Sequence, residues 1–66
     1  MKIVLNGDPY DVPGPVTIAD LLARLDIDSR RVAVERNFVV LKRALFDTTD
    51  VSDGDQIEIV NFVGGG

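Results

Sequence analysis

The segment that decides the fold is Thr17–Leu25, "TIADLLARL", which carries the helical pattern of the chain. Its apolar residues recur at the spacing i, i+3, i+4 and i+7, which gathers them on one face of a helix. Thr17 is a good N-cap, and Asp20 three residues later forms a weaker version of the capping box and suits the positive end of the helix dipole. We therefore expect one helix with a single apolar face for packing on a sheet, formed by Ile18, Leu21, Leu22 and Leu25.

The residues before this helix predict a β-hairpin. The start, "MKIVLN", alternates as a strand does when one of its sides is buried, with Met1, Ile3 and Leu5 on one face. The "NG" that ends this stretch tolerates positive φ angles and is a strong hairpin signal. The return strand should run through 10–12 and stop at "VPGP", because proline cannot donate to a strand ladder.

The residues after the helix predict further strands. "VAVERN" (32–37) alternates again, and "FVVL" (38–41) is expected to pair with it through a turn near Asn37. The remaining expected elements are a single helical turn at 44–46, a polar turn at 53–55 and a last strand, "QIEIVNFV", at 56–63.

The order of these elements is a hairpin, one helix and then two or three strands. One helix on one face of a mixed sheet makes an α+β roll. We expect the first and last strands to be parallel neighbours at its centre, because both are strongly apolar and the helix allows a parallel crossover. This order is that of the β-grasp, or ubiquitin-like, fold. We assign it to residues 1–63, followed by a flexible glycine tail at 64–66.

The composition of the 66-residue chain excludes several classes of chemistry. Because it contains no Cys and no His, it has no nucleophilic triad, zinc-finger spacing or thiol redox motif. Asp53 and Asp55 flank a glycine in the polar turn, and we interpret them as turn formers rather than as acid–base groups or ligands of a cation. We therefore expect no catalytic side chain, no metal site and no bound cofactor.

Charge and hydropathy restrict the partners and the location. The net charge is −4, which disfavours binding to nucleic acid or to an anionic membrane. No apolar run approaches the ~18 residues of a membrane span, and the start lacks the layout of a signal peptide. We expect a cytoplasmic protein that binds neither nucleic acid nor membrane.

The last strand suggests a contact surface. If Ile57 and Ile59 point at the helix, then Val60 and Phe62 point away from it, onto the open face of the sheet near Val4. Apolar residues that gather where water is expected mark a surface for a partner. The alternative is that a bend or a covering loop makes Val60 and Phe62 part of the core.

The chain ends in three glycines, Gly64, Gly65 and Gly66. A carboxylate at the end of an extended glycine segment can enter a narrow tunnel, because glycine has no Cβ to clash with the walls. At about 3.3–3.6 Å a residue, three residues reach on the order of 10 Å beyond the sheet. The alternatives are a frayed terminus or a cloning remnant without a role.

Four stretches resemble the ThiS family of sulfur carrier proteins across essentially the whole chain: "MKIVLNG", "VAVERN", "DGDQIEIV" and "NFVGGG". The resemblance implies that the C-terminal glycine, here Gly66, is adenylylated with ATP by a ThiF-like adenylyltransferase and then converted to a thiocarboxylate. A ThiG-like thiazole synthase takes up the sulfur, which a source such as a cysteine desulfurase supplies. The resemblance therefore implies a cosubstrate of thiamin biosynthesis rather than an enzyme.

The same resemblance assigns roles to the other residues of the tail. Gly65 is the second member of the required glycine pair, and Gly64 belongs to its flexible lead. Phe62 and Val63 match the segment that enters the cleft of the partner.

This chain departs from the family in its central hairpin. In the family a Gly commonly follows "VAVERN" and a proline ends the next strand, whereas this chain has Phe38 and Leu41 at these places. One alternative is a MoaD-like sulfur carrier for molybdopterin synthesis, which shares the fold and the Gly-Gly end but usually has a longer chain. Two others are a ubiquitin-like binding module with an inert tail and a modifier that is conjugated to other proteins.

Overall fold

The computed structural model describes residues 1–62, so the expectations for Val63 and for the glycine tail at 64–66 lie outside the described residues. The strands are β1 (Lys2–Leu5), β2 (Asp8–Asp11), β3 (Val32–Arg36), β4 (Val39–Leu41) and β5 (Gln56–Asn61). The helices are α1 (Ile18–Arg24) and two short 3-10 helices, η1 (Ser29–Arg31) and η2 (Arg43–Leu45).

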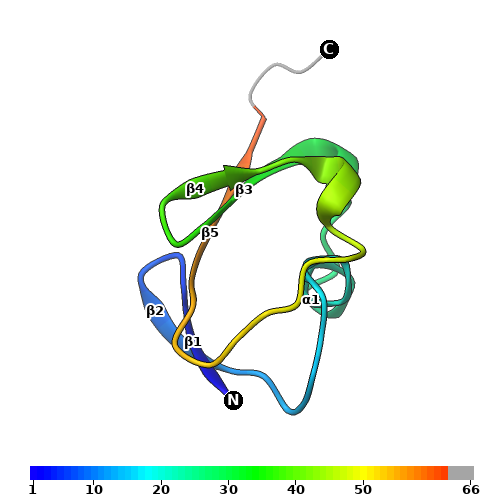
Figure 1. Cartoon of the computed structure of the whole chain (residues 1–66). Coiled ribbons are helices and arrows are strands. Elements are labelled where there is room, and N and C mark those ends of the chain that lie inside the picture. The colour runs from blue at the N-terminus through cyan, green and yellow to red at the C-terminus, as the bar shows by residue number, and fades with distance from the viewer. Residues whose placement is uncertain (63–66) are drawn as a thin grey trace.

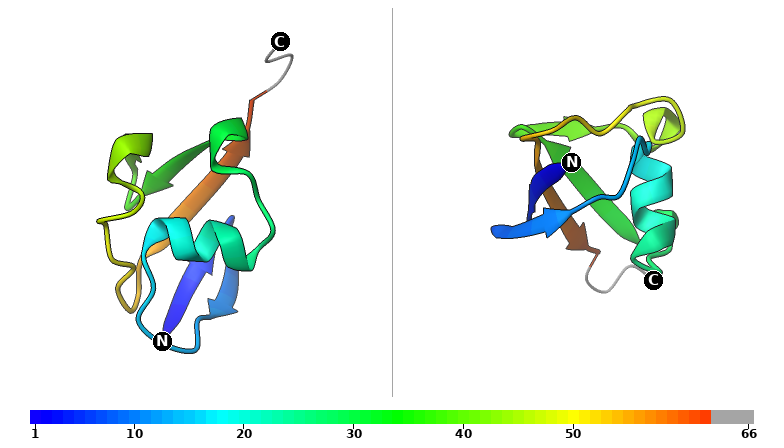
Figure 2. Two further views of the ribbon diagram at one scale, coloured as in Figure 1. Left: turned by 90° about the vertical axis from the view of Figure 1, so that its right-hand side faces the viewer. Right: turned by 90° about the horizontal axis from the view of Figure 1, so that it is seen from below.

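The five strands form one mixed sheet in the order β2-β1-β5-β3-β4. The strands β1 and β5 run parallel, and the other neighbours are antiparallel. Helix α1 lies on one side of this sheet, and no element among residues 1–62 covers the other side (Figure 1, Figure 2). The predicted α+β arrangement is confirmed, with the first and last strands as parallel neighbours.

The hydrophobic core lies between α1 and the sheet. The predicted apolar face of α1 is confirmed, because Ile18, Leu21 and Leu22 are buried and Leu25 at the helix end packs partly against them. The sheet contributes Ile3, Val32, Val34 and Ile57 to the same cluster, and Val12, Phe46 and Val51 from the connecting segments close it. A chain this short has few buried side chains, so each of them matters to its stability.

Thr17 and Asp20 form a complete capping box at the start of α1. The Thr17 hydroxyl accepts a hydrogen bond from the Asp20 amide at 3.1 Å, and the Asp20 carboxylate accepts one from the Thr17 amide at 3.0 Å. Two amides that would lack a partner inside the helix are thereby satisfied. The predicted start of the helix is confirmed.

Two hairpin turns hold residues in the left-handed region of φ. Asn6 and Gly7 have φ angles of 49° and 86°, as the Asn-Gly signal predicts. In the turn between β3 and β4, Asn37 lies at 52° and Phe38 at 70°. The central hairpin therefore forms, although Phe38 occupies a conformation that costs a residue with a Cβ about 1–2 kcal/mol.

The boundaries of three strands differ from the expectation, and β4 begins at Val39 because Phe38 belongs to the turn. β2 begins at Asp8, two residues before the predicted start, and ends at Asp11 rather than at Val12. It therefore contains Pro9. Because β2 is an edge strand, the missing amide of Pro9 can be tolerated there. The last strand, β5, ends at Asn61, so Phe62 follows it rather than belonging to it.

Asp55 does more than form the predicted turn. Its carboxylate is buried and accepts hydrogen bonds from the Ser52 amide at 2.8 Å, from Arg36 Nε at 2.9 Å and from Asn37 Nδ2 at 3.0 Å. Burial raises the pKa of Asp55, but the hydrogen bonds from Ser52, Asn37 and Arg36 outweigh it and hold the pKa below its usual value. The carboxylate thus ties the start of β5 to the turn between β3 and β4.

Candidate functional site

Strand β5 positions the candidate site, because it is the central strand of the sheet and the last element before the tail. Ile57 is buried and Ile59 is half-buried on the side of α1, whereas Glu58 and Val60 are exposed. The predicted alternation along the strand is confirmed. The strand β5 pairs with β1 and with β3. In addition, the Ile59 amide donates a hydrogen bond to the Asn6 side chain at 2.7 Å.

Val60 and Phe62 form the exposed apolar end of this strand. Each side chain is 57% exposed. Val60 lies opposite Ala33 of β3, and the Phe62 amide donates a hydrogen bond to the Arg31 carbonyl at 2.9 Å. Backbone pairing therefore continues one residue past β5, while both side chains face solvent. The alternative that a bend or loop makes them core is wrong.

Val4 lies on the same open face, but it does not lie beside Val60 and Phe62 as predicted. In the parallel pairing of β1 with β5, Val4 is opposite Gln56, four residues before Val60. At about 3.3 Å a residue, this separates Val4 from Val60 by on the order of 13 Å along the strand. The expected nearness of Val4 to Val60 and Phe62 is wrong, because alternation within a strand does not determine its register against a neighbour.

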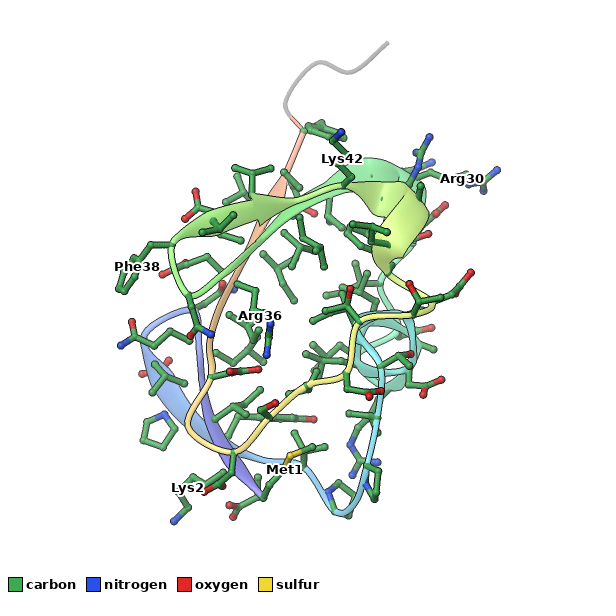
Figure 3. All side chains as sticks on the ribbon, viewed as in Figure 1. Met1, Lys2, Arg30, Arg36, Phe38 and Lys42 are labelled. Carbon is green, nitrogen blue, oxygen red and sulfur yellow. The ribbon has the colours of Figure 1, made fainter. Side chains whose placement is uncertain are left out.

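The structure also exposes a run of apolar side chains at the β3–β4 hairpin that the sequence reasoning did not assign to a surface. Phe38, Val39 and Val40 are 77%, 68% and 67% exposed, and Figure 3 shows Phe38 at the tip of the β3–β4 hairpin. Phe38 lies in the turn, and Val39 and Val40 lie on β4, an edge strand with a neighbour only on its β3 side. The apolar run "FVVL" indicated a strand, but its place at the edge of the sheet depends on the order of strands that are distant in sequence.

The centre of the open face is acidic. Glu35 of β3 and Glu58 of β5 lie directly opposite each other, and Val40 of β4 lies on the other side of Glu35. Like charges in opposite positions of an antiparallel pair repel each other. The apolar end formed by Val60 and Phe62 therefore adjoins an acidic region.

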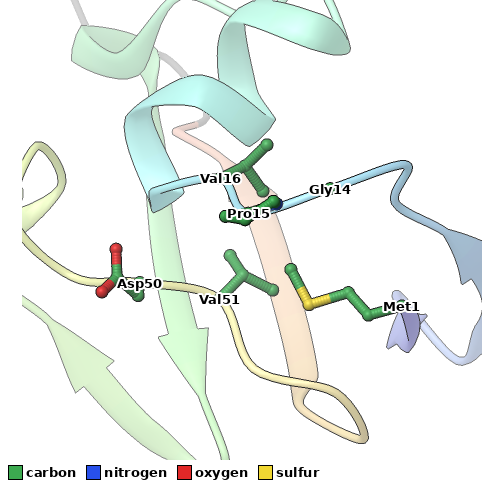
Figure 4. A pocket seen from close by; sticks show the side chains of 6 residues that line it. All are labelled: Met1, Gly14, Pro15, Val16, Asp50 and Val51. Atoms are coloured by element: carbon green, nitrogen blue, oxygen red, sulfur yellow. The ribbon is translucent and has the colours of Figure 1, made fainter.

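An open hollow of about 520 Å³ lies near the N-terminus, at the end of the molecule away from the end of β5 (Figure 1, Figure 4). Its lining is mostly apolar and comprises Met1, Gly14, Pro15, Val16, Asp50 and Val51. Asp50 is the one carboxylate among these residues, so the hollow offers no pair of titratable groups for acid–base chemistry.

The carboxylates elsewhere do not form a site for chemistry either. Within residues 1–62, no three side chains of His, Cys, Asp or Glu gather in a way that suits a metal ion. Asp53 accepts a hydrogen bond from the Lys2 amide at 2.8 Å, which is a structural task like that of Asp55. In the same part of the chain, no helix is long and apolar enough to cross a membrane.

Residues 3–66 of this chain match the model of the ThiS family. The chain belongs to the ThiS family. The sulfur carrier protein ThiS of Bacillus subtilis (strain 168) is 44% identical over 50 residues, which cover 76% of each chain.

A second relative is a longer protein. A thiazole synthase of Paramagnetospirillum magneticum is 44% identical over 66 residues, which are all of this chain and 20% of that protein. This chain therefore spans about a fifth of the length of that relative.

A solved structure confirms the fold class. The crystal structure of a thiamine biosynthesis protein (ThiS) from Geobacter metallireducens is 40% identical, with a TM-score of 0.88 and complete coverage of both chains. The β-grasp fold predicted from the order of the elements is thereby confirmed.

Proposed function

We propose that this chain is a sulfur carrier protein of thiamine biosynthesis, in which the reactive group is the terminal carboxylate of Gly66. The observation that carries the proposal is the family match, which runs through the end of the chain at residue 66. Residues 1–62 support it, because Asp53 and Asp55 have structural partners and no metal-type cluster is present in this part of the chain. The protein is then a cosubstrate on which other enzymes act.

The chemistry of such a carboxylate takes two steps. Its oxygen attacks the α-phosphorus of ATP, so that pyrophosphate leaves and an acyl-adenylate forms. A sulfur nucleophile then attacks the acyl carbon, the bond to AMP breaks, and one oxygen departs with AMP. If the sulfur arrives as a protein persulfide, a thiol must cleave the resulting S–S bond and is oxidised to a disulfide. The product in either case is a thiocarboxylate.

The described residues contribute a firm base for this tail. Strand β5 is paired on both sides, and the bond from the Phe62 amide to the Arg31 carbonyl extends the pairing to the last described residue. We propose that Val60 and Phe62 dock at the mouth of a partner's cleft while Val63 and the glycines 64–66 enter it. Apolar contact at the base offsets the entropy that is lost when a glycine segment is ordered.

The partners follow from this chemistry. A ThiF-like adenylyltransferase supplies activation with ATP, a source such as a cysteine desulfurase supplies sulfur, and a ThiG-like thiazole synthase receives it. The relative named thiazole synthase supports the last of these. Since the reaction uses ATP and thiols, we place it in the cytoplasm. Val4, about four residues away along the sheet, belongs to the same proposed partner surface.

Intact-mass spectrometry tests the proposal. The chain is incubated with ATP, the adenylating enzyme of the source organism and sulfide, and its mass is expected to rise by the difference between sulfur and oxygen. A variant that lacks Gly66 should remain folded and show no such shift. Thiolation of the shortened chain, or none of the full chain, contradicts the proposal, and the second result points to a binding module with an inert tail. Transfer of the sulfur to a molybdopterin precursor rather than to a thiazole synthase indicates the MoaD-like alternative.

A further inference from the structure

Although the chain as a whole is acidic, three of its seven basic residues lie around the end of β5, and a fourth, Arg43, follows one of them in η2. We call this group the basic collar; it consists of Arg30, Arg31, Lys42 and Arg43. Together with Asp28, which pairs with two of them, these residues have a formal charge of +3. The other three cations and ten carboxylates of the chain give −7, which accounts for the total of −4.

Backbone pairing places the collar at the base of the tail. The Arg31 carbonyl accepts the hydrogen bond from the Phe62 amide. Leu41 of β4 pairs with Val34 of β3, so the next residue, Lys42, lies at the level of Ala33. Ala33 in turn lies opposite Val60 of β5. Figure 3 shows Arg30 and Lys42 at the end of the molecule where β5 ends.

Most of the positive charge of the collar is available to a partner. Arg30 is engaged, since its Nε and Nη2 donate to the Asp28 carboxylate at 3.1 Å and 3.0 Å and thereby lower the pKa of Asp28 to about 2. Arg31 is 83% exposed and lies 3.9 Å from the same carboxylate. Lys42 and Arg43 are exposed and have no carboxylate of residues 1–62 within 4.0 Å.

We propose that the basic collar binds an acidic rim at the mouth of the adenylating partner's cleft and orients the tail toward it. The proposal rests on the function given above. An acidic rim repels the remainder of this chain, including the opposed Glu35 and Glu58, and attracts the end from which the tail continues. Complementary charges of this kind act mainly on the rate and orientation of encounter. The adenylating enzyme is the relevant partner because activation must precede every later step.

Two matched double variants test the collar. Lys42→Glu with Arg43→Glu changes the collar, whereas Lys2→Glu with Arg24→Glu changes the net charge by the same amount elsewhere. Lys2 pairs with Asp11 at the far end of β1, and Arg24 lies in the last turn of α1. All four side chains are exposed, so thermal melting should show that both variants fold.

Binding to the adenylating enzyme is measured by calorimetry at about 50 mM and about 500 mM salt, a range over which exposed charges become strongly screened. We expect the collar variant to lose affinity by roughly tenfold or more at low salt and to show a weaker salt dependence. The control variant should stay within about threefold of the wild type, and Lys42→Arg with Arg43→Lys should bind as the wild type does.

Three results overturn the proposal about the collar. These are equal binding by the collar and control variants, wild-type binding that does not weaken with salt, and binding of a DNA duplex that depends on Lys42 and Arg43. If the wild type is thiolated while the collar variant binds normally, the collar proposal fails and the proposed function stands. If the wild type is never thiolated, the proposed function itself fails.

Discussion

The two sides of β5 show how a short strand can serve both stability and recognition. On the side of α1, Ile57 is 1% exposed and belongs to the core, whereas Val60 on the other side is 57% exposed. Burying an aliphatic side chain contributes about 1.5–3 kcal/mol, and leaving it in water contributes little. The two functions are thus carried by alternate residues of one strand, and substitutions can separate them.

The largest effect on stability is expected for Ile57→Ala. Removal of a buried Ile side chain costs about 2–5 kcal/mol, which is comparable to the ~3–5 kcal/mol that a core of this size supplies. Urea unfolding followed by circular dichroism should find the variant largely unfolded. Ile57→Val, with an expected cost of about 0.5–1.5 kcal/mol, is the matched control. A loss of under about 1 kcal/mol for Ile57→Ala contradicts the assignment of this side to the core.

A somewhat smaller loss of stability is expected for Asp55→Asn. This substitution removes the charge that Arg36, Asn37 and the Ser52 amide all contact. Breaking hydrogen bonds to a buried charge costs about 1–3 kcal/mol. Chemical unfolding at pH 7 should show this loss. A variant as stable as the wild type indicates that the start of β5 does not depend on the carboxylate.

The Asp55 carboxylate should also make the stability of the protein depend on pH. Because the pKa of Asp55 is below its ordinary 3.8 in the folded protein, the stability that it contributes is complete above that value. This contribution is lost as the pH falls through the lowered pKa of the folded state. Melting curves of the wild type should therefore decline below about pH 4 more steeply than those of Asp55→Asn. Parallel curves contradict the assignment.

The sequence predicted the local features and the parallel neighbours β1 and β5 well, but it did not predict strand register or the contacts of buried polar groups. The helix from Thr17 and the turn at Asn6 follow from spacing and conformational preference, which neighbouring residues determine. The position of Val4 opposite Gln56 does not, because register depends on how whole strands pack. The burial of Asp55 also escaped prediction, since two of its partners, Arg36 and Asn37, are distant in sequence and reach it only through the fold.

The candidate site shows the same limit. Exposure of Val60 and Phe62 followed from alternation along one strand, so the sequence was sufficient. The basic collar was not visible, because only the pairing of β3 with β5 and β4 brings Arg31 and Lys42 to the same end of the sheet. Exposure of Val40 likewise required knowledge that β4 is an edge strand.

A gain in stability is expected when the exposed Phe38 is replaced by Gly. Its φ of 70° suits glycine, so the substitution relieves strain, although the greater freedom of glycine in the unfolded chain offsets part of the gain. The net increase should be about 0.5–1 kcal/mol. Phe38→Ala keeps a Cβ in the same conformation and should show no such gain. Equal effects of the two substitutions in thermal melts contradict an origin in backbone strain.

The smallest effect on stability is expected for Phe62→Ala, because its ring is 57% exposed and its backbone bond to Arg31 remains possible. The free energy of unfolding should stay within about 0.5 kcal/mol of the wild type. Affinity for the adenylating enzyme should nevertheless fall by roughly tenfold, as for an anchor residue at the centre of an interface. Calorimetric titration measures this, with Phe38→Ala, at a side chain that is even more exposed, as a control that should bind normally.

The separation of stability from function is tested most directly by measuring thiolation rate and melting temperature on the same samples of Phe62→Ala and Ile57→Val. Both are assayed with ATP, the adenylating enzyme and sulfide at a temperature where each variant is folded. We predict that Phe62→Ala melts like the wild type and is thiolated slowly, while Ile57→Val melts earlier and is thiolated at the normal rate. Normal thiolation of Phe62→Ala, or a large drop in its melting temperature, contradicts the division of β5 into a stabilising side and a docking side.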